Sequence, residues 1–75
     1  MKDVDDMILK LKDIFGNSAS KVDLFNDLDK YCIYSIDTYY SVNKNTLKRL
    51  KQIKAKITFI DFNKDGLRIL VEIRN

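Results

Sequence analysis

The 75-residue sequence contains no histidine, no proline and no tryptophan, and it has only one cysteine and two glycines. Histidine is the usual general base near neutral pH, a frequent zinc ligand and the central member of Ser/His and Cys/His nucleophile pairs. Its absence removes the middle of most hydrolase mechanisms, and two glycines are too few for a phosphate-binding glycine-rich loop. We therefore expect a protein that is not an enzyme and that needs no cofactor.

Cys32 is the only cysteine, so it cannot form an internal disulfide and nothing indicates an oxidising compartment. The amino terminus carries three aspartates where a secretory signal would need a basic start and an unbroken apolar run. No stretch approaches the roughly 20 consecutive apolar residues of a transmembrane helix. These absences predict a cytoplasmic protein that does not enter a membrane.

The composition predicts a single folded domain over residues 1–75. Apolar residues make up 45% of the chain and charged residues 33%, far from the low hydrophobicity of disordered segments. A domain of this size buries roughly 60% of the surface that its unfolded chain exposes, so its net stability is small.

Charge is distributed unevenly, although the net charge is only +3. Residues 1–37 hold five lysines and eight aspartates, a net charge of −3, whereas residues 38–75 hold nine basic and three acidic residues, a net charge of +6. Such a distribution attracts an acidic partner, or the acidic half of a second copy in a homodimer.

Apolar spacing predicts a first helix over residues 3–15, with Asp3 as its N-cap and Gly16 as its left-handed stop. One helical stripe contains Val4, Met7, Ile8, Leu11, Ile14 and Phe15. A second helix is expected to begin at Ser20, because Asp23 follows it at the spacing of a capping box. The residues expected to face inward from this second helix are Leu24, Phe25 and Leu28.

Residues 31–42 fit two structures. Their aromatic and β-branched residues alternate as in a strand, and we favour a strand over residues 31–37. A helical frame fits the same residues, so the choice between strand and helix stays open at this point.

A third helix is predicted from about residue 46 to 55, after the cap-forming cluster Asn43, Asn45 and Thr46. A hairpin then follows, with strands near 57–62 and 67–73 and a positive φ at Gly66. The predicted fold class is α+β, in the order α-α-β-α-β-β. Its helices would lie on one face of a small sheet that ends in a C-terminal antiparallel hairpin.

Four tyrosines within ten residues are the expected partner-binding residues: Tyr31, Tyr34, Tyr39 and Tyr40. Four hydroxyls cannot all be buried with hydrogen-bond partners in so small a domain, so at least one or two rings should face outward. Exposed tyrosine is a frequent interface anchor. The alternative is that these rings are ordinary half-buried strand residues.

The third helix is expected to carry a basic patch: Lys44, Lys48, Arg49, Lys51 and Lys56. Cations in the first turn of a helix oppose its dipole, and binding of an anion there would give this placement a use. The alternative is a solvated lysine-rich surface.

The hairpin also matches the EF-hand calcium-loop pattern, through Asp61, Asn63, Asp65 and Glu72. A loop of that type needs a helix on both sides, and the residues that precede Glu72 have strand composition. We interpret the match as accidental and expect no metal site, because hairpin turns select Asp, Asn and Gly on their own account.

These observations favour a small non-catalytic module that binds another protein with an acidic surface, as an inhibitor, adaptor or small subunit. Proteins of phages and mobile elements that block a host enzyme often have this size and composition. The alternative function is a nucleic-acid-binding protein that uses the basic helix over residues 44–56.

Overall fold

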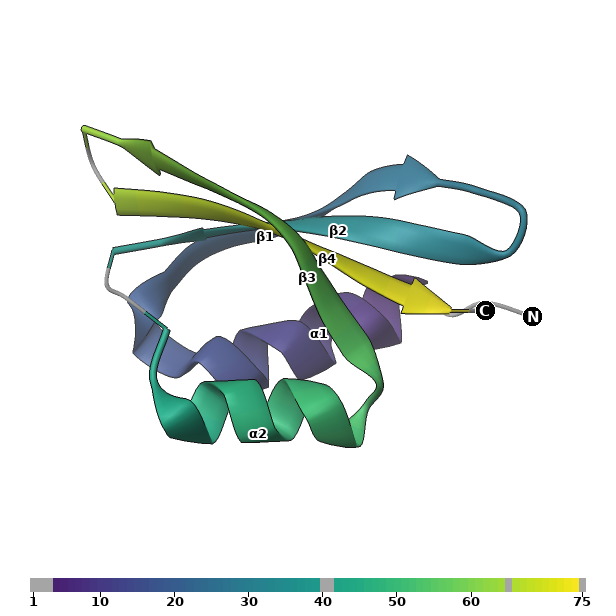
Figure 1. Cartoon of the computed structure of the whole chain (residues 1–75), viewed down its shortest axis with the longest axis horizontal. Helices are drawn as coiled ribbons and strands as arrows, with labels where there is room; N and C mark the ends of the chain where they lie inside the picture. Colours follow the sequence, from purple (N-terminus) through teal and green to yellow (C-terminus); the bar gives the residue numbers. More distant parts are fainter. Residues whose placement is uncertain (1–3, 40–41, 65, 75) are drawn as a thin grey trace.

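Two helices and four strands form the described part of the chain, which in this computed structural model comprises residues 4–39, 42–64 and 66–74 (Figure 1). The strands form one antiparallel sheet in the order β1-β2-β4-β3. Both helices lie on one face of this sheet, so the predicted α+β class and the C-terminal hairpin are confirmed (Figure 1). In chain order the elements are α1 (Val4–Phe15), a 3₁₀ turn (Gly16–Ser18), β1 (Ala19–Asp27), β2 (Tyr31–Thr38), α2 (Lys44–Gln52), β3 (Ala55–Asn63) and β4 (Gly66–Arg74).

Helix α1 confirms the first predicted helix. Half of the predicted apolar stripe is buried, namely Leu11, Ile14 and Phe15, and the other half packs against the core. Gly16 follows with a φ of +62°, which is the left-handed conformation expected of a helix stop. The predicted cap, Asp3, lies outside the described residues.

The second predicted helix is wrong, because its residues form the edge strand β1. Val22 is buried and Leu24 half-buried on the side that faces the helices, as residues two apart on a strand should be. A bulge between Leu24 and Asn26 interrupts the pairing with β2 and leaves Phe25 exposed. Pairing with β2, which the local sequence does not reveal, therefore overrides the helical spacing.

Strand β2 confirms the strand that we favoured over residues 31–37 and extends it to Thr38. Every second residue is buried against the helices: Cys32, Tyr34, Ile36 and Thr38. Strand β4, the other central strand, presents Ile69, Val71 and Ile73 to the same side. The two central strands thus supply most of the sheet's contribution to the core.

The core is one cluster between the sheet and the two helices. Helix α1 contributes three side chains, whereas α2 contributes a single fully buried apolar one, Leu50. Burial of each such side chain stabilises the fold by roughly 1.5–3 kcal/mol. Because α2 is short and contributes so little, the sheet edge beside it is incompletely covered.

Helix α2 begins at Lys44 because Asn43 caps it, with the Asn43 Oδ1 atom accepting a 2.8 Å hydrogen bond from the Thr46 amide. The helix ends at Gln52, three residues before the predicted end. Lys54 then adopts a left-handed φ of +58°, an unusual conformation for a residue other than glycine. This residue turns the chain from α2 into β3.

Strands β3 and β4 form the predicted hairpin. Gly66 adopts a φ of +145°, as the prediction of a positive φ required. A Cβ atom at this position would overlap the carbonyl oxygen of Thr38 at the end of β2. Gly66 is therefore fixed both by its backbone conformation and by its close approach to the neighbouring strand.

Candidate functional site

The four tyrosines do not form one surface. Tyr34 is only 3% exposed and belongs to the core, so the prediction that it anchors a partner is wrong. Tyr31 lies three residues away on the same strand, which places it on the opposite face of the sheet. Tyr39 is 57% exposed, which confirms that at least one ring faces outward, and Tyr40 lies outside the described residues.

The predicted basic patch divides into two parts. Arg49 points toward α1, where its Nη2 atom lies 2.7 Å from Asp13 Oδ2 and its Nη1 atom donates to the Asp13 carbonyl oxygen at 3.2 Å. This arginine joins the two helices and is not part of a free basic surface. The four lysines all border one groove, Lys44, Lys48 and Lys51 from α2 and Lys56 from the outer face of β3.

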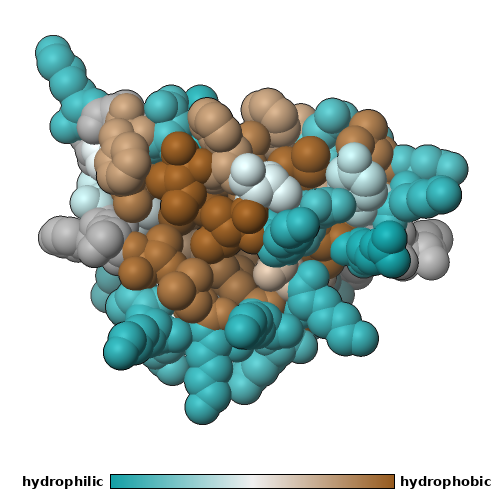
Figure 2. Space-filling model, viewed as in Figure 1, coloured by the Kyte–Doolittle hydropathy of each residue, from teal (hydrophilic) through white to brown (hydrophobic). Residues whose placement is uncertain are grey.

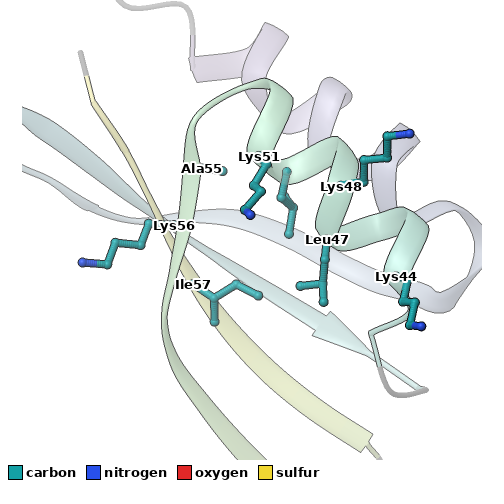
Figure 3. Close-up of a pocket in the computed structure, with 8 residues that line it drawn as sticks. Lys44, Leu47, Lys48, Lys51, Ala55, Lys56 and Ile57 are labelled. Atoms are coloured by element: carbon teal, nitrogen blue, oxygen red, sulfur yellow. The ribbon is translucent and has the colours of Figure 1, made fainter.

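This groove lies between α2 and β3 and has a volume of about 600 Å³. Leu47 from α2 and Ile57 from β3 project into the space between the two elements (Figure 3). We call it the lysine-rimmed groove; its apolar lining residues are Leu47, Leu50, Ala55 and Ile57. On the face of the molecule that presents α2 and β3, apolar side chains gather in one area surrounded by hydrophilic ones (Figure 2).

The sequence produces this groove because α2 has more apolar residues than its contacts with the core use. Leu50 is 2% exposed, but Leu47, which lies three residues earlier, is 44% exposed. Ile57 is half-buried at the start of β3. Within residues 4–39, 42–64 and 66–74, no element fully covers Leu47 or Ile57 from outside, so these two side chains remain accessible.

Three of the groove lysines, Lys44, Lys48 and Lys51 of α2, have no acidic partner in the part of the chain that the structure describes, whereas Lys56 lies opposite Glu72 in the ladder. The ion pairs found there involve Lys21, Arg49 and Arg68. None of the eight residues that line the groove is acidic. The site therefore combines an apolar lining with uncompensated positive charge, which suits a ligand that is both apolar and acidic.

Sequence reasoning found the lysines but missed the apolar residues of the groove. A signal was present in β3, where Ile57, Phe59, Ile60 and Phe62 do not keep the simple alternation of a half-buried strand. The bulge between Ile57 and Phe59 explains this pattern, because it changes which side chains face the helices. Large apolar residues of β3 consequently appear on both faces of the sheet edge.

The outer face of the sheet, away from the helices, is electrically balanced. Arg68 of β4 bridges Asp37 near the end of β2, with its Nε atom 2.9 Å from Asp37 Oδ1. The hydrogen bond and charge of Asp37 raise the pKa of Arg68 above its ordinary value, and the charge of Asp61 adds to this. Register places four cations and four acids on this face: Lys21, Lys56, Arg68 and Arg74, and Asp23, Asp37, Asp61 and Glu72. A polyanion would gain little there.

A second hollow, of about 670 Å³, lies where the ends of β1, β2 and the hairpin meet. It includes Tyr39 and Lys64, and also the ion pair of Asp37 with Arg68. Since that arginine already has a partner, this hollow presents less free charge than the lysine-rimmed groove. We regard the groove as the candidate site.

Three of the EF-hand-like residues, Asp61, Asn63 and Glu72, lie on the strands of a hairpin rather than between two helices, and the fourth, Asp65, lies outside the described residues. Asp61 is opposite Arg68 in the ladder, whereas Glu72 is opposite Lys56 at the other end of β3. The four-residue step from Arg68 to Glu72 along β4 spans roughly 13 Å. Glu72 and Asp61 are therefore too far apart to ligate one ion. Among the described residues, no group of three or more His, Cys, Asp or Glu side chains could hold a metal ion.

Neither helix of the described chain is long and apolar enough to cross a membrane. No protein-family model, curated protein or solved structure matches this chain. The interpretation of the site therefore depends on the chain's own residues.

Proposed function

We propose that this chain is a non-catalytic binding module that takes an acidic, apolar segment of another protein into the lysine-rimmed groove. It would serve its partner as an inhibitor, adaptor or small subunit. The observation that carries this proposal is the apolar lining of Leu47 and Ile57 beside three lysines of α2, Lys44, Lys48 and Lys51, that have no acidic partner among the described residues. Apolar contact supplies affinity, and the lysines select acidic partners and speed their approach.

A nucleic acid is the second candidate, because the same lysines could contact phosphates. The groove favours a protein segment for two reasons. Its lining contains no aromatic side chain on which an unpaired base could stack. The large aromatic side chain that β3 presents on the outer face, Phe59, lies among balanced charges.

Selection from a random twelve-residue peptide library tests the proposal. We expect the folded chain to select peptides that combine Asp or Glu with large apolar residues. Leu47→Asp should lower the affinity for the selected peptides at least tenfold, because it places a charge in the apolar lining. Leu9→Asp is the matched control: Leu9 is also exposed, lies on α1 and does not line the groove.

The lysines are tested in the same way. Lys48→Glu with Lys51→Glu should also weaken binding at least tenfold, whereas Lys10→Glu with Lys12→Glu on α1 changes the net charge equally and should have little effect. An empty selection, or equal losses in groove and control variants, would contradict the proposed function. Oligonucleotide binding that the lysine changes abolish and Leu47→Asp leaves intact would instead support the nucleic-acid alternative.

A further inference from the structure

Strand β3 is an edge of the sheet that carries exposed large apolar side chains on both faces. Phe62, 79% exposed, and Ile60 lie on the side of the helices, opposite Leu67 and Ile69. Phe59, 53% exposed, lies on the outer face, opposite Leu70. A ligand must follow the edge of the strand to contact both sets.

The other edge strand does not share this property. In β1, Phe25 is the one large apolar side chain that the structure shows as exposed, and it lies at a bulge. An exposed, hydrophobic sheet edge is a template for pairing with another chain. This difference selects β3 as the edge that binds.

The register shows which backbone groups of β3 are free. Asn63 is opposite Gly66, and only two residues lie between them. A pair that closes so short a loop is a hydrogen-bonded pair, because in a non-hydrogen-bonded pair the backbone groups of both residues would point away from each other. Hydrogen-bonded pairs alternate along an antiparallel ladder. Asp61 and Phe59 therefore bond to β4, and the amides and carbonyls of Ile60 and Phe62 point away from the sheet.

Cations also lie on both sides of this edge. Lys44, Lys48 and Lys51 project from α2 on the helix side, whereas Lys56, opposite Glu72, lies on the outer face (Figure 3). An extended segment presents alternate side chains to the two sides. Acidic residues on its groove side could therefore meet the three lysines of α2, whereas the outer side, where Glu72 balances Lys56, offers mainly apolar contact with Phe59.

We infer that the partner segment binds as an extended strand, added to the free edge of β3 at Ile60 and Phe62, with its groove-facing side chains against Leu47 and Ile57. This inference rests on the proposed function. A helix lying in the groove would cover Leu47 and Ile57, but it could not reach Phe59 and would leave the Ile60 and Phe62 amides without partners. Strand addition satisfies these amides and covers both faces together.

Amide hydrogen exchange with the tightest peptide from the twelve-residue library tests this inference. We expect saturating peptide to slow exchange of the Ile60 and Phe62 amides by about tenfold or more, because each gains a hydrogen bond. Phe59 and Asp61 are controls within the same strand, since their amides already bond to β4. Methylation of alternate peptide nitrogens along one edge should abolish binding, and methylation along the other should not.

Three results would overturn the inference. The first is a peptide that binds but leaves the exchange rates of the Ile60 and Phe62 amides unchanged. Such a peptide, with its apolar residues at helical spacing, would exclude strand addition and leave the proposed function intact. Protection of these amides that rises with the concentration of the chain alone would show that a second copy occupies the edge. An empty selection overturns the inference and the proposed function together.

Discussion

Arg49 of α2 and Asp13 of α1 form an ion pair whose closest atoms, Nη2 and Oδ2, lie 2.7 Å apart. The same guanidinium donates to the Asp13 carbonyl oxygen in the last turn of α1. A cation at the carboxyl end of a helix also interacts favourably with the helix dipole. This arginine consequently holds α2 beside α1, and its neighbours Lys48 and Lys51 remain free to contact a ligand.

We expect Arg49→Ala to lower the free energy of unfolding by about 0.5–1 kcal/mol, a small loss because both side chains are partly exposed. Peptide binding should not change. Lys48→Ala should do the reverse, weakening peptide binding without affecting stability. Urea unfolding and peptide titration of the two variants check this contrast. If Arg49→Ala lost as much peptide affinity as Lys48→Ala, the division of the basic patch would be wrong.

The two glycines should differ in their tolerance of a methyl group. Gly66→Ala should cost about 3 kcal/mol or more, because φ is +145° and the new Cβ would overlap the backbone of Thr38. Gly16→Ala should cost only about 1 kcal/mol, because φ is +62° but nothing lies within 4 Å of the new atom. Thermal and urea unfolding measure both variants; equal costs would mean that the hairpin does not approach β2 as closely as the structure shows.

Lys54 offers a stabilising substitution. Its φ of +58° is a left-handed conformation, which costs an L-residue with a side chain about 1–2 kcal/mol and glycine almost nothing. Lys54→Gly should therefore raise the free energy of unfolding by about 0.5 kcal/mol, after the greater flexibility of glycine in the unfolded chain is subtracted. Lys64→Gly, at the hairpin turn, controls for the loss of one lysine charge. A lower unfolding midpoint in Lys54→Gly would contradict the expectation.

The sequence was sufficient for the elements whose periodicity is local. The stripe of α1 and the alternation of β4 both describe one element facing one core, and the structure confirms them. The apolar spacing of residues 20–28 does not show the strand that they form. The bulge at Phe25 disrupts the alternation of β1 and leaves a spacing that fits a helix. Only pairing with β2, which places Leu24 opposite Tyr34 and Asn26 opposite Ile33, decides the outcome, and the spacing within residues 20–28 does not reveal it.

The prediction of the candidate site from the sequence was incomplete for a related reason. Once a strand over residues 31–37 is assumed, alternation places Tyr34 and Tyr31 on opposite faces, so proximity in sequence could not make them one surface. The lysines were predictable because their charge is evident from composition. The groove was not predictable, because it depends on where helix α2 ends and on how far strand β3 extends past α2. Tertiary packing sets both.

Phenylalanine substitutions separate binding from stability most directly. Phe15 is buried between α1 and the sheet, so Phe15→Ala should cost about 3–5 kcal/mol through lost contacts and a cavity. Phe62 is 79% exposed, so Phe62→Ala should change the unfolding free energy by no more than about 0.5 kcal/mol. If Phe62 contacts the added strand, the same substitution should lower the affinity for the selected peptide several-fold without changing the stability of the fold. An exposed phenylalanine at the sheet edge has a physical explanation when a ligand covers its ring. Unchanged peptide affinity in Phe62→Ala would remove that explanation and would exclude this end of β3 from the binding surface.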